Sequence, residues 1–290
     1  MPTQTLEHTA VATVTYNSND QVEQFLGSAR AAQAEGLSVI IADNGSVDRE
    51  RLRRIASEHG ARLLELPENV GYGGALNAAI AQLPADVRYV LVSNPDVVLS
   101  PGSVETLVGS MESDDRIGAI GPRVLNSDGS HYPSARSLPS LRNGIGHAVF
   151  TRAWPDNPWS RHYRVVGSDP DSQRDAGWLS GSCVLVRRSA FEEIGGFDDG
   201  YFMYFEDVDL GYRLGKAGWR NVYEPRASVL HSGAHSTTSE SDRMLRVHHD
   251  SAYRYLSKKY EAPYWAPLRG VLRLGLGLRY RLLRRRAQRP

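Results

Sequence analysis

Hydrophobic and polar positions alternate along the first third of the chain in a pattern typical of an α/β protein. Short apolar, β-branched runs take turns with longer stretches rich in Gln, Glu and Ala, and the first of these stretches is closed by Gly36. The predicted strands are 10–16, 37–43, 61–66 and 89–93, and the predicted helices between them are 20–35, 47–59 and 73–83. Such alternation predicts a parallel sheet with helices on both faces and ligand sites at the carboxyl ends of its strands.

The regular pattern breaks after a predicted strand at 117–125. Residues 126–176 contain five prolines and show no clean period, and a connection of that length in a compact domain is usually functional. Regular elements then resume with a strand at 178–187, a short helix near 189–194, an aromatic loop at 197–205, a helix at 206–217, a strand at 219–223 and a helix at 240–260. Pro263 and Pro267 separate the last helix from an arginine-rich tail.

The composition permits a full hydrophobic core. The 290 residues are 41% hydrophobic and 23% charged, which excludes an intrinsically disordered chain and a disulfide-stapled miniprotein. A single cysteine, Cys183, cannot form an internal disulfide and fits a reducing compartment. We expect an α/β domain at 1–239, with halves at 1–125 and 126–239, followed by C-terminal helices at 240–290.

Charge is unevenly distributed along the chain. The net charge is +1, but eight arginines fall in the last 23 residues, where there is no Asp or Glu, so the rest of the chain carries 26 basic and 33 acidic residues. An acidic body without a recognition motif argues against nucleic-acid binding. The N-terminus lacks the pattern of a secretion signal, and no window reaches the roughly 18 apolar residues of a membrane span, so we expect a cytoplasmic protein.

The tail has the pattern of a basic amphipathic helix. Its apolar residues share one broad face at helical spacing, and most of its arginines lie away from the centre of that face, although Arg279 and Arg286 intrude on it. The apolar residues are Leu268, Val271, Leu272, Leu274, Leu276, Leu278, Leu282 and Leu283. We expect peripheral attachment to the inner face of the cell membrane, with a helix packed on the body as the alternative. The aromatic residues Trp154, Trp159, Tyr264 and Trp265 are candidates for interface docking or for ordinary packing.

Polar residues with no role in a core follow three of the predicted strands. They are Thr15-Tyr16-Asn17, Asp43-Asn44-Gly45-Ser46 and Asn94-Pro95-Asp96. Asp43 is either a turn former or a carboxylate that accepts a hydrogen bond from a nucleobase or ribose. Asp96 is either a cap or a ligand of a hard divalent cation that bridges to a diphosphate.

Three further features carry candidate chemistry. Residues 69–77, NVGYGGALN, are glycine-rich and open a helix, which suits close backbone approach to a phosphate, although the motif is neither a P-loop nor GxGxxG. Glu206-Asp207-Val208-Asp209 begins a helix after an aromatic run, so these carboxylates either serve the helix dipole or include a general base with a raised pKa. His231 is either structural or a metal ligand.

The order of these motifs makes the sequence resemble the family 2 glycosyltransferases, inverting enzymes with the GT-A nucleotide-diphospho-sugar-binding fold. The resemblance spans about residues 10–235. It is carried in order by TVTYNS, ADNGSVD, ENVGYGGALNAAI, VSNPDV in the place of the family's DxD metal motif, GSCVLVRR, GGFDDGYFMYFEDVDLGYRL and the later His231. The NVGYGGALN and FMYFEDVDLGYR blocks look most like the rhamnosyltransferase branch.

The resemblance implies roles residue by residue. Asp207 is the base that deprotonates the acceptor hydroxyl, Glu206 orients the acceptor, and Trp178 and Gly181 lie on the acceptor side. Asp96 and His231 bind Mg²⁺ or Mn²⁺, and Asn94 replaces the first DxD carboxylate, which leaves fewer protein charges on the ion. The residues implied for the nucleotide sugar are Thr15, Tyr16, Asn17, Asp43, Asn44, Gly71, Gly74, Asn77 and Asn94, with Asp43 at the base.

The resemblance also implies a reaction. L-rhamnose passes from dTDP-L-rhamnose to the N-acetylglucosamine of a polyprenyl-diphosphate-linked acceptor, as in the linker of cell-wall arabinogalactan, by a single inverting displacement without a protein nucleophile. Two alternatives stay open: the same fold with a UDP-hexose or UDP-galactofuranose donor, and a catalytically silent nucleotide-sugar-binding scaffold on the membrane. The sequence leaves self-association into a homo-oligomer open.

Overall fold

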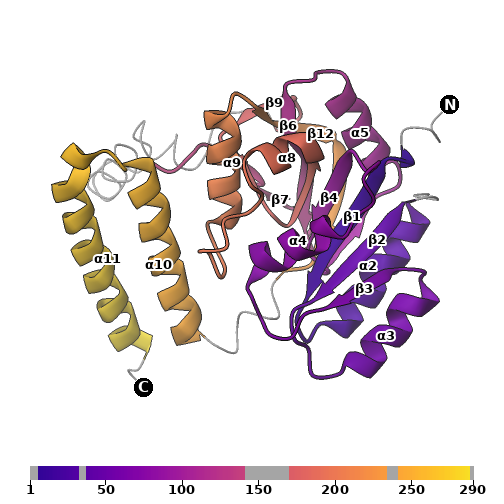
Figure 1. Ribbon diagram of the computed structural model, residues 1–290, viewed down its shortest axis with the longest axis horizontal. Helices are drawn as coiled ribbons and strands as arrows, with labels where there is room; N and C mark the ends of the chain where they lie inside the picture. Colours follow the sequence, from indigo (N-terminus) through magenta and orange to yellow (C-terminus); the bar gives the residue numbers. More distant parts are fainter. Residues whose placement is uncertain (1–5, 33–36, 141–169, 234–240, 288–290) are drawn as a thin grey trace.

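One mixed sheet of ten strands forms the centre of the computed structural model, and helices cover both of its faces. Two long helices form the C-terminal end of the chain (Figure 1). The structure describes residues 6–32, 37–140, 170–233 and 241–287. Trp154 and Trp159 lie outside the described residues.

The first half of the chain forms the parallel part of the sheet, as predicted. Strands β3, β2, β1 and β4 lie side by side in that order, and every residue of β1 and of β4 is buried, because helices cover both faces. Thr15 pairs with Asp43, so the carboxyl ends of β1 and β2 meet at one edge. The elements are β1 (Thr9–Thr15), α2 (Asn19–Ala31), β2 (Ser38–Asp43), α3 (Arg49–Glu58), β3 (Arg62–Glu65), α4 (Tyr72–Ala81) and β4 (Tyr89–Ser93).

The second half of the chain completes the same sheet. β11 (Cys183–Arg187) is antiparallel to both β4 and β6 (Ile117–Asn126), and β12 (Arg220–His231) runs parallel to β6. β5 (Val97–Leu99) pairs antiparallel with β12, which puts His231 beside Val97. The halves predicted at 1–125 and 126–239 therefore share one sheet.

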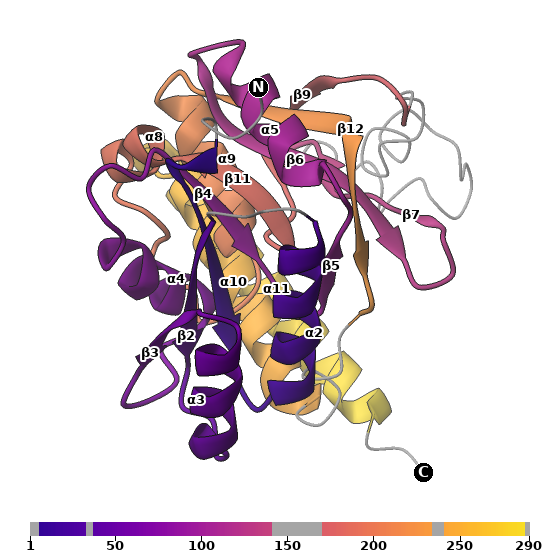
Figure 2. The ribbon, with the colours of Figure 1, turned by 90° about the vertical axis from the view of Figure 1, so that its right-hand side faces the viewer.

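Apolar side chains on the two faces of the sheet form two separate core layers. Alternate residues of β1 point to opposite faces, so that Val11 belongs to one layer and Ala10 and Ala12 to the other. The first layer is covered by α2, α3 and α5 (Ser103–Glu112), which face the viewer in Figure 2, and the second by α4, α8 (Arg188–Glu193) and α9 (Glu206–Lys216).

Some elements differ from the prediction. The strand expected at 178–187 is divided into β10 (Trp178–Leu179) and β11 by a turn, and β12 continues to residue 231 because register shifts let it follow β6. β5 and α5 were not predicted, although Val104, Leu107, Val108 and Met111 have helical spacing and are buried. The short strands β7 (His131–Tyr132), β8 (Ala135–Arg136) and β9 (Arg174–Ala176) come from the region without a clean period.

The C-terminal helices form a hairpin beside α9. α10 (Ser241–Lys259) lies between α9 and α11 (Ala266–Ala287), so α11 is the outermost helix on that side (Figure 1). Within the described residues, no helix combines the length and the apolar character needed to span a bilayer.

Candidate active site

The predicted nucleoside residues gather where β1 and β2 end. Thr15 is buried, whereas the ring of Tyr16 is 46% exposed. Asn17 adopts a left-handed conformation with φ of 53°, its N–H donates to Ser46 Oγ at 2.8 Å, and its Oδ1 accepts from the N–H of Val47 at 2.9 Å. This turn leaves Tyr16 and Val47 as exposed apolar groups at the edge of the sheet, where a planar base could pack.

Asp43 is fully buried beneath this turn. Its Oδ1 accepts from the N–H of Ser46 at 2.9 Å, and its Oδ2 forms an ion pair with Arg49 Nε at 3.2 Å. Arg49 was not singled out in the sequence. The carboxylate of Asp43 therefore shapes the turn that carries Tyr16 and Val47, in addition to any contact with a nucleobase.

Asn44 has a structural role in addition to its predicted role as a nucleotide ligand, which stays a prediction. Its Nδ2 donates to Asn69 Oδ1 at 2.8 Å and to the carbonyl of Gly71 at 3.1 Å, and its Oδ1 accepts from the N–H of Val70 at 2.9 Å. These bonds occupy the side chain, which fastens the glycine-rich loop to the end of β2.

Gly71 of that loop is required by the fold, apart from the predicted approach to a phosphate. Gly71 has φ of 84° and ψ of 173°, and a Cβ there would lie 2.4 Å from the carbonyl oxygen of Phe202. The N–H of Tyr72 donates to the same oxygen at 3.0 Å. Gly71 thus admits the backbone of the 197–205 loop, and this close contact requires glycine whether or not a phosphate binds.

Asn77 and Gly74 face the same loop. Asn77 Nδ2 donates to the carbonyl of Phe197 and to Asp199 Oδ1, both at 2.8 Å, while its Oδ1 accepts from the N–H of Phe197 at 2.9 Å. A Cβ on Gly74 would meet Val70 and Asp199. The side chain of Asn77 therefore holds this loop, and its predicted position beside the donor stays a prediction.

Asp96 and His231 meet at the edge of the sheet, as the predicted metal site requires. The pairing of β5 with β12 brings Asp96 Oδ1 within 3.1 Å of His231 Nε2. Neither atom has a hydrogen-bond partner within the described part of the chain, and both side chains are mostly buried. The backbone of Asn94 is fixed nearby, since its N–H donates to the carbonyl of Ser182 at 2.9 Å.

This pair fits a divalent ion. Neighbouring ligand atoms of an octahedral Mg²⁺ lie about 3 Å apart, and a carboxylate with an imidazole is an acceptable ligand set for Mn²⁺. Among the described residues there is no group of three or more His, Cys, Asp and Glu side chains that could hold a metal. The described residues thus offer two candidate ligands, so a bound ion would need further ligands such as diphosphate oxygens and water.

Glu206 and Asp207 begin α9 and lie close to Tyr72. Phe205, which precedes them, has φ of 66°, a strained value for an aromatic residue. Asp207 Oδ2 accepts from the N–H of Gly181 at 3.0 Å, and its Oδ1 accepts from the N–H of Val208 at 2.8 Å. The hydroxyl of Tyr72 donates to the carbonyl of Gly181 at 2.7 Å, so Gly181 links Tyr72 to the carboxylate.

Burial raises the pKa of both carboxyl groups. The pKa of Glu206 rises to about 8, first because of burial and then because of the neighbouring Asp207. Burial also raises the pKa of Asp207, while the N–H groups of Gly181 and Val208 oppose that shift. Two neighbouring carboxyl groups with raised pKa values suit proton transfer. Burial, Glu206 and Asp207 raise the pKa of Tyr72 well above 10, so its hydroxyl stays a donor.

The acceptor side contains two residues that the sequence did not reveal. The guanidinium of Arg136 lies 5.4 Å from the ring centres of both Trp178 and Tyr132, and its charge lowers the pKa of Asp207. The ring of Tyr132 in turn meets His231 edge to face at 6.3 Å. Arg136 and Tyr132 therefore connect Asp207 to the pair of Asp96 and His231. They lie in the region without a clean period, and no spacing to another motif marks them.

The family of the chain follows from comparison with known proteins. The model of the family described as Glycosyl transferase family 2 matches residues 10–195. The chain belongs to glycosyl transferase family 2.

Two individual relatives in this comparison are rhamnosyltransferases. The chain is 47% identical, over 94% of its length and 92% of the relative's, to the N-acetylglucosaminyl-diphospho-decaprenol L-rhamnosyltransferase of Mycobacterium tuberculosis. It is 31% identical to the rhamnosyltransferase WbbL of Escherichia coli, over 85% of this chain and 91% of that one.

Solved structures confirm the GT-A glycosyltransferase fold. A mannosyltransferase of Pyrobaculum calidifontis in complex with GDP-Man and Mn²⁺ matches with a TM-score of 0.60 at 17% identity, over 94% of this chain and 70% of that chain. GalNAc-T7 with UDP, GalNAc and Mn²⁺ matches with a TM-score of 0.59 at 12% identity, over 93% of this chain and 55% of that chain.

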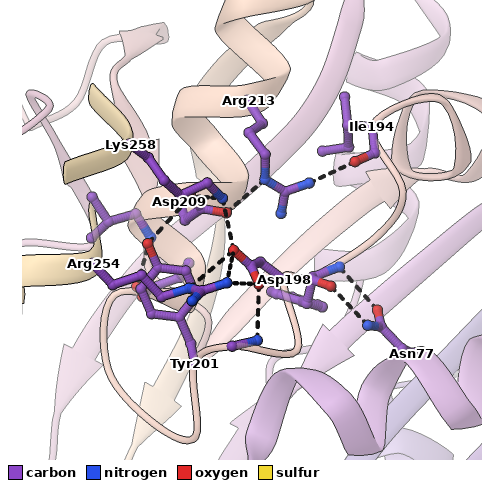
Figure 3. Close-up of polar contacts among 12 residues, drawn as sticks. Asn77, Ile194, Asp198, Tyr201, Asp209, Arg213, Arg254 and Lys258 are labelled. Atoms are coloured by element: carbon purple, nitrogen blue, oxygen red, sulfur yellow. Dashed lines mark hydrogen bonds and ion pairs between the residues drawn. The ribbon is translucent and has the colours of Figure 1, made fainter. Parts of the chain in front are cut away.

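In this family 2 transferase, ion pairs from α10 hold the loop that precedes the base. Lys258 Nζ lies 2.8 Å from Asp198 Oδ2 and 2.6 Å from Asp209 Oδ1, and Arg254 and Arg213 complete the cluster (Figure 3). Although burial raises the pKa of Asp198, hydrogen bonds from Arg254 and Lys258 bring it below its ordinary value. The C-terminal extension therefore anchors both ends of the segment that carries Glu206 and Asp207.

Replacing Lys258 with methionine is expected to loosen this loop. We expect a loss of about 2 kcal/mol of stability, because two poorly exposed carboxylates lose a shared cation that is itself partly exposed. The turnover number should fall more than donor affinity, and Lys258→Arg should restore part of it. Lys216→Met removes an exposed pair with Glu261 and is the control in both urea unfolding and kinetics. Equal effects of the two variants would contradict the anchoring role.

Replacing Glu206 with glutamine is expected to change how stability depends on pH. The pKa of Glu206 is about 8 in the folded protein and 4.5 in an unfolded chain, so the folded state binds the extra proton between these values. Stability from this group is full below pH 4.5 and falls as pH rises through 8. The melting temperature of Glu206→Gln relative to the native protein should therefore rise from pH 5 to pH 9, by at least about 2 °C. A constant difference across that range would contradict the raised pKa.

Proposed function

We propose that this chain transfers L-rhamnose from dTDP-L-rhamnose, with inversion, to the N-acetylglucosamine of a polyprenyl-diphosphate-linked acceptor. The observation that carries the proposal is that two carboxylate sites lie near Tyr72: Asp96, which lies 3.1 Å from His231, and Glu206 with Asp207. The activities for which the two rhamnosyltransferase relatives are named support the choice of sugar, and that of the mycobacterial relative supports the choice of acceptor.

At the donor end, Asp96 and His231 are the residues that would hold a divalent ion. When bound there, such an ion offsets the negative charge of the departing diphosphate. Mn²⁺ in the two structural neighbours supports this role. Because the chain offers one carboxylate and one imidazole, we expect metal affinity to be higher in the presence of the nucleotide than in its absence.

At the acceptor end, Asp207 would take the proton of the attacking hydroxyl. The N–H groups of Gly181 and Val208 fix the orientation of its carboxylate, and its raised pKa makes it a stronger base than an exposed aspartate. Glu206, whose Oε2 is buried without a hydrogen bond within the described residues, would orient the acceptor. One displacement then breaks the bond to the diphosphate and forms the new glycosidic bond, so no protein nucleophile is needed.

A donor screen tests the proposal. The purified protein is incubated with a short-chain polyprenyl-diphosphate-GlcNAc and either dTDP-L-rhamnose, a UDP-hexose or UDP-galactofuranose, with Mg²⁺, Mn²⁺ or EDTA. We expect a disaccharide product with dTDP-L-rhamnose and metal, and none after chelation. If a UDP-sugar gave product and dTDP-L-rhamnose did not, the UDP-sugar would be the donor. No product from any donor, with tight nucleotide binding intact, would indicate a silent binding protein.

A further inference from the structure

The structure divides the apolar face predicted for the tail into two stripes. Leu268, Leu272 and Leu276 are half-buried, and they follow one another at the four-residue spacing of a single helical stripe. In the same stripe, Tyr280 donates from its hydroxyl to Asp242 of α10 at 3.3 Å. This inner stripe fastens α11 to α10, so packing and surface exposure are both present in one helix.

The outer stripe of α11 is exposed. Val271, Leu274 and Leu278 are 66%, 76% and 59% exposed, and their spacing of three and four residues puts them on one face. Tyr264 and Trp265 continue the exposed apolar surface at the start of the hairpin's second helix. Among the described residues, eight large apolar side chains are exposed, and five of them lie in this one segment. The other three, Tyr16, Val47 and Val70, belong to the donor edge of the sheet.

Cations lie to one side of the outer stripe, in the groove between α10 and α11 that Leu276 and Tyr280 of the inner stripe also line. A groove of about 600 Å³ between α10 and α11 is lined by Arg246, Arg273 and Arg281, with Tyr253 and Tyr280 among its walls. One acidic side chain, Asp250, also lines it and lies 3.6 Å from Arg246. Residues 262–290 contain no Asp or Glu, so α11 carries no negative side chain to offset its arginines.

We propose that the outer face of α11, formed by Val271, Leu274 and Leu278 and bordered on its α10 side by Arg273 and Arg281, docks on an anionic lipid bilayer. An apolar stripe beside arginines is complementary to acyl chains below a layer of negative headgroups. A second copy of the chain fits less well, because a two-fold contact through this face would bring like-charged arginines together.

The docking surface lies on the same extension that anchors the base loop. α11 packs on α10, and α10 supplies Lys258 and Arg254 to Asp198 and Asp209. Docking would thus hold the loop before Glu206 close to a bilayer. The biological role of this docking rests on the proposed function, in which the acceptor is linked to a lipid. The evidence for the docking surface itself is the exposed stripe and the arginines beside it.

Vesicle sedimentation tests the surface. The full chain is mixed with vesicles of phosphatidylcholine alone or with phosphatidylglycerol added, and binding is compared with that of Val271→Gln/Leu274→Gln/Leu278→Gln and of Arg273→Gln/Arg281→Gln. We expect each variant to lose at least tenfold in affinity for anionic vesicles and to keep the native melting temperature, since the positions are exposed. Arg30→Gln/Arg54→Gln removes two exposed charges from α2 and α3 and should bind like the native chain.

A transfer assay separates this inference from the proposed function. The apolar triple variant should keep full activity on a soluble short-chain acceptor and lose it on a long-chain acceptor embedded in vesicles. Unchanged vesicle binding by the triple variant, or equal binding to neutral vesicles, would overturn the inference. A dimer of the native chain, detected by light scattering and absent in the triple variant, would also overturn the inference. If no donor supports transfer but vesicle binding follows the pattern above, the function fails and the docking surface stands.

Discussion

Replacing Asp207 with asparagine is expected to lower the rate of glycosyl transfer by at least about 10³-fold. The amide keeps the shape of the side chain and an oxygen to accept from Gly181 or Val208, but it cannot take a proton from the acceptor hydroxyl. Donor binding should change little, because the predicted donor residues lie at the ends of β1, β2 and β4 and at the start of α4, and not in α9. The measurement is single-turnover transfer together with donor affinity from calorimetry.

A matched variant guards this test against trivial causes. Asp115→Asn makes the same change in an exposed turn and should retain full activity. Turnover of Asp207→Asn within tenfold of the native rate would remove Asp207 from the role of base. Loss of donor binding in parallel with turnover would instead point to a structural role at the start of α9.

Replacing Gly71 with alanine is expected to destabilise the protein by about 2–5 kcal/mol, from backbone strain together with overpacking. The φ of 84° and ψ of 173° belong to a region that side chains rarely enter, and the new Cβ would collide with the backbone of Phe202. Because the 197–205 loop must then move, transfer activity should fall as well. Urea unfolding and steady-state kinetics measure the two effects.

Gly60 offers the control for backbone strain. It has φ of 65°, and a Cβ there would meet nothing within 4 Å, so Gly60→Ala should cost only about 1 kcal/mol. Any excess cost at Gly71 then reports the contact with Phe202. Equal costs at the two positions, with activity retained, would show that the close approach of the two loops is unimportant.

The sequence predicted the parallel half of the sheet well because each of its strands has a strong local pattern. Buried strands such as β4 are continuous apolar runs, and their boundaries are marked by polar residues. β5 has three residues and owes its existence to pairing with β12, so no local pattern could predict it. The buried residues of α5 have helical spacing, so the sequence contained enough information to predict this helix.

The candidate site likewise contains some residues that the sequence could indicate and others that it could not. Asp96 and Asp207 follow from their positions at a strand end and a helix start, where topology leaves few choices. Asn44 and Asn77 are polar residues in the expected places, yet their amides are used to hold loops together, and sequence cannot distinguish such a contact from a ligand contact. Arg136 reaches the base only through the folded path of the chain.

The order of strands has a consequence for synthesis of the protein. Asp96 lies beside β5, whose partner in the described sheet is β12, and the other metal candidate, His231, is the last residue of β12. On the ribosome, the parallel strands β1 to β4 are complete long before β12 emerges. A nascent or truncated chain can therefore build the nucleoside edge early, but it acquires the pair that would hold an ion only after the last strand has been made.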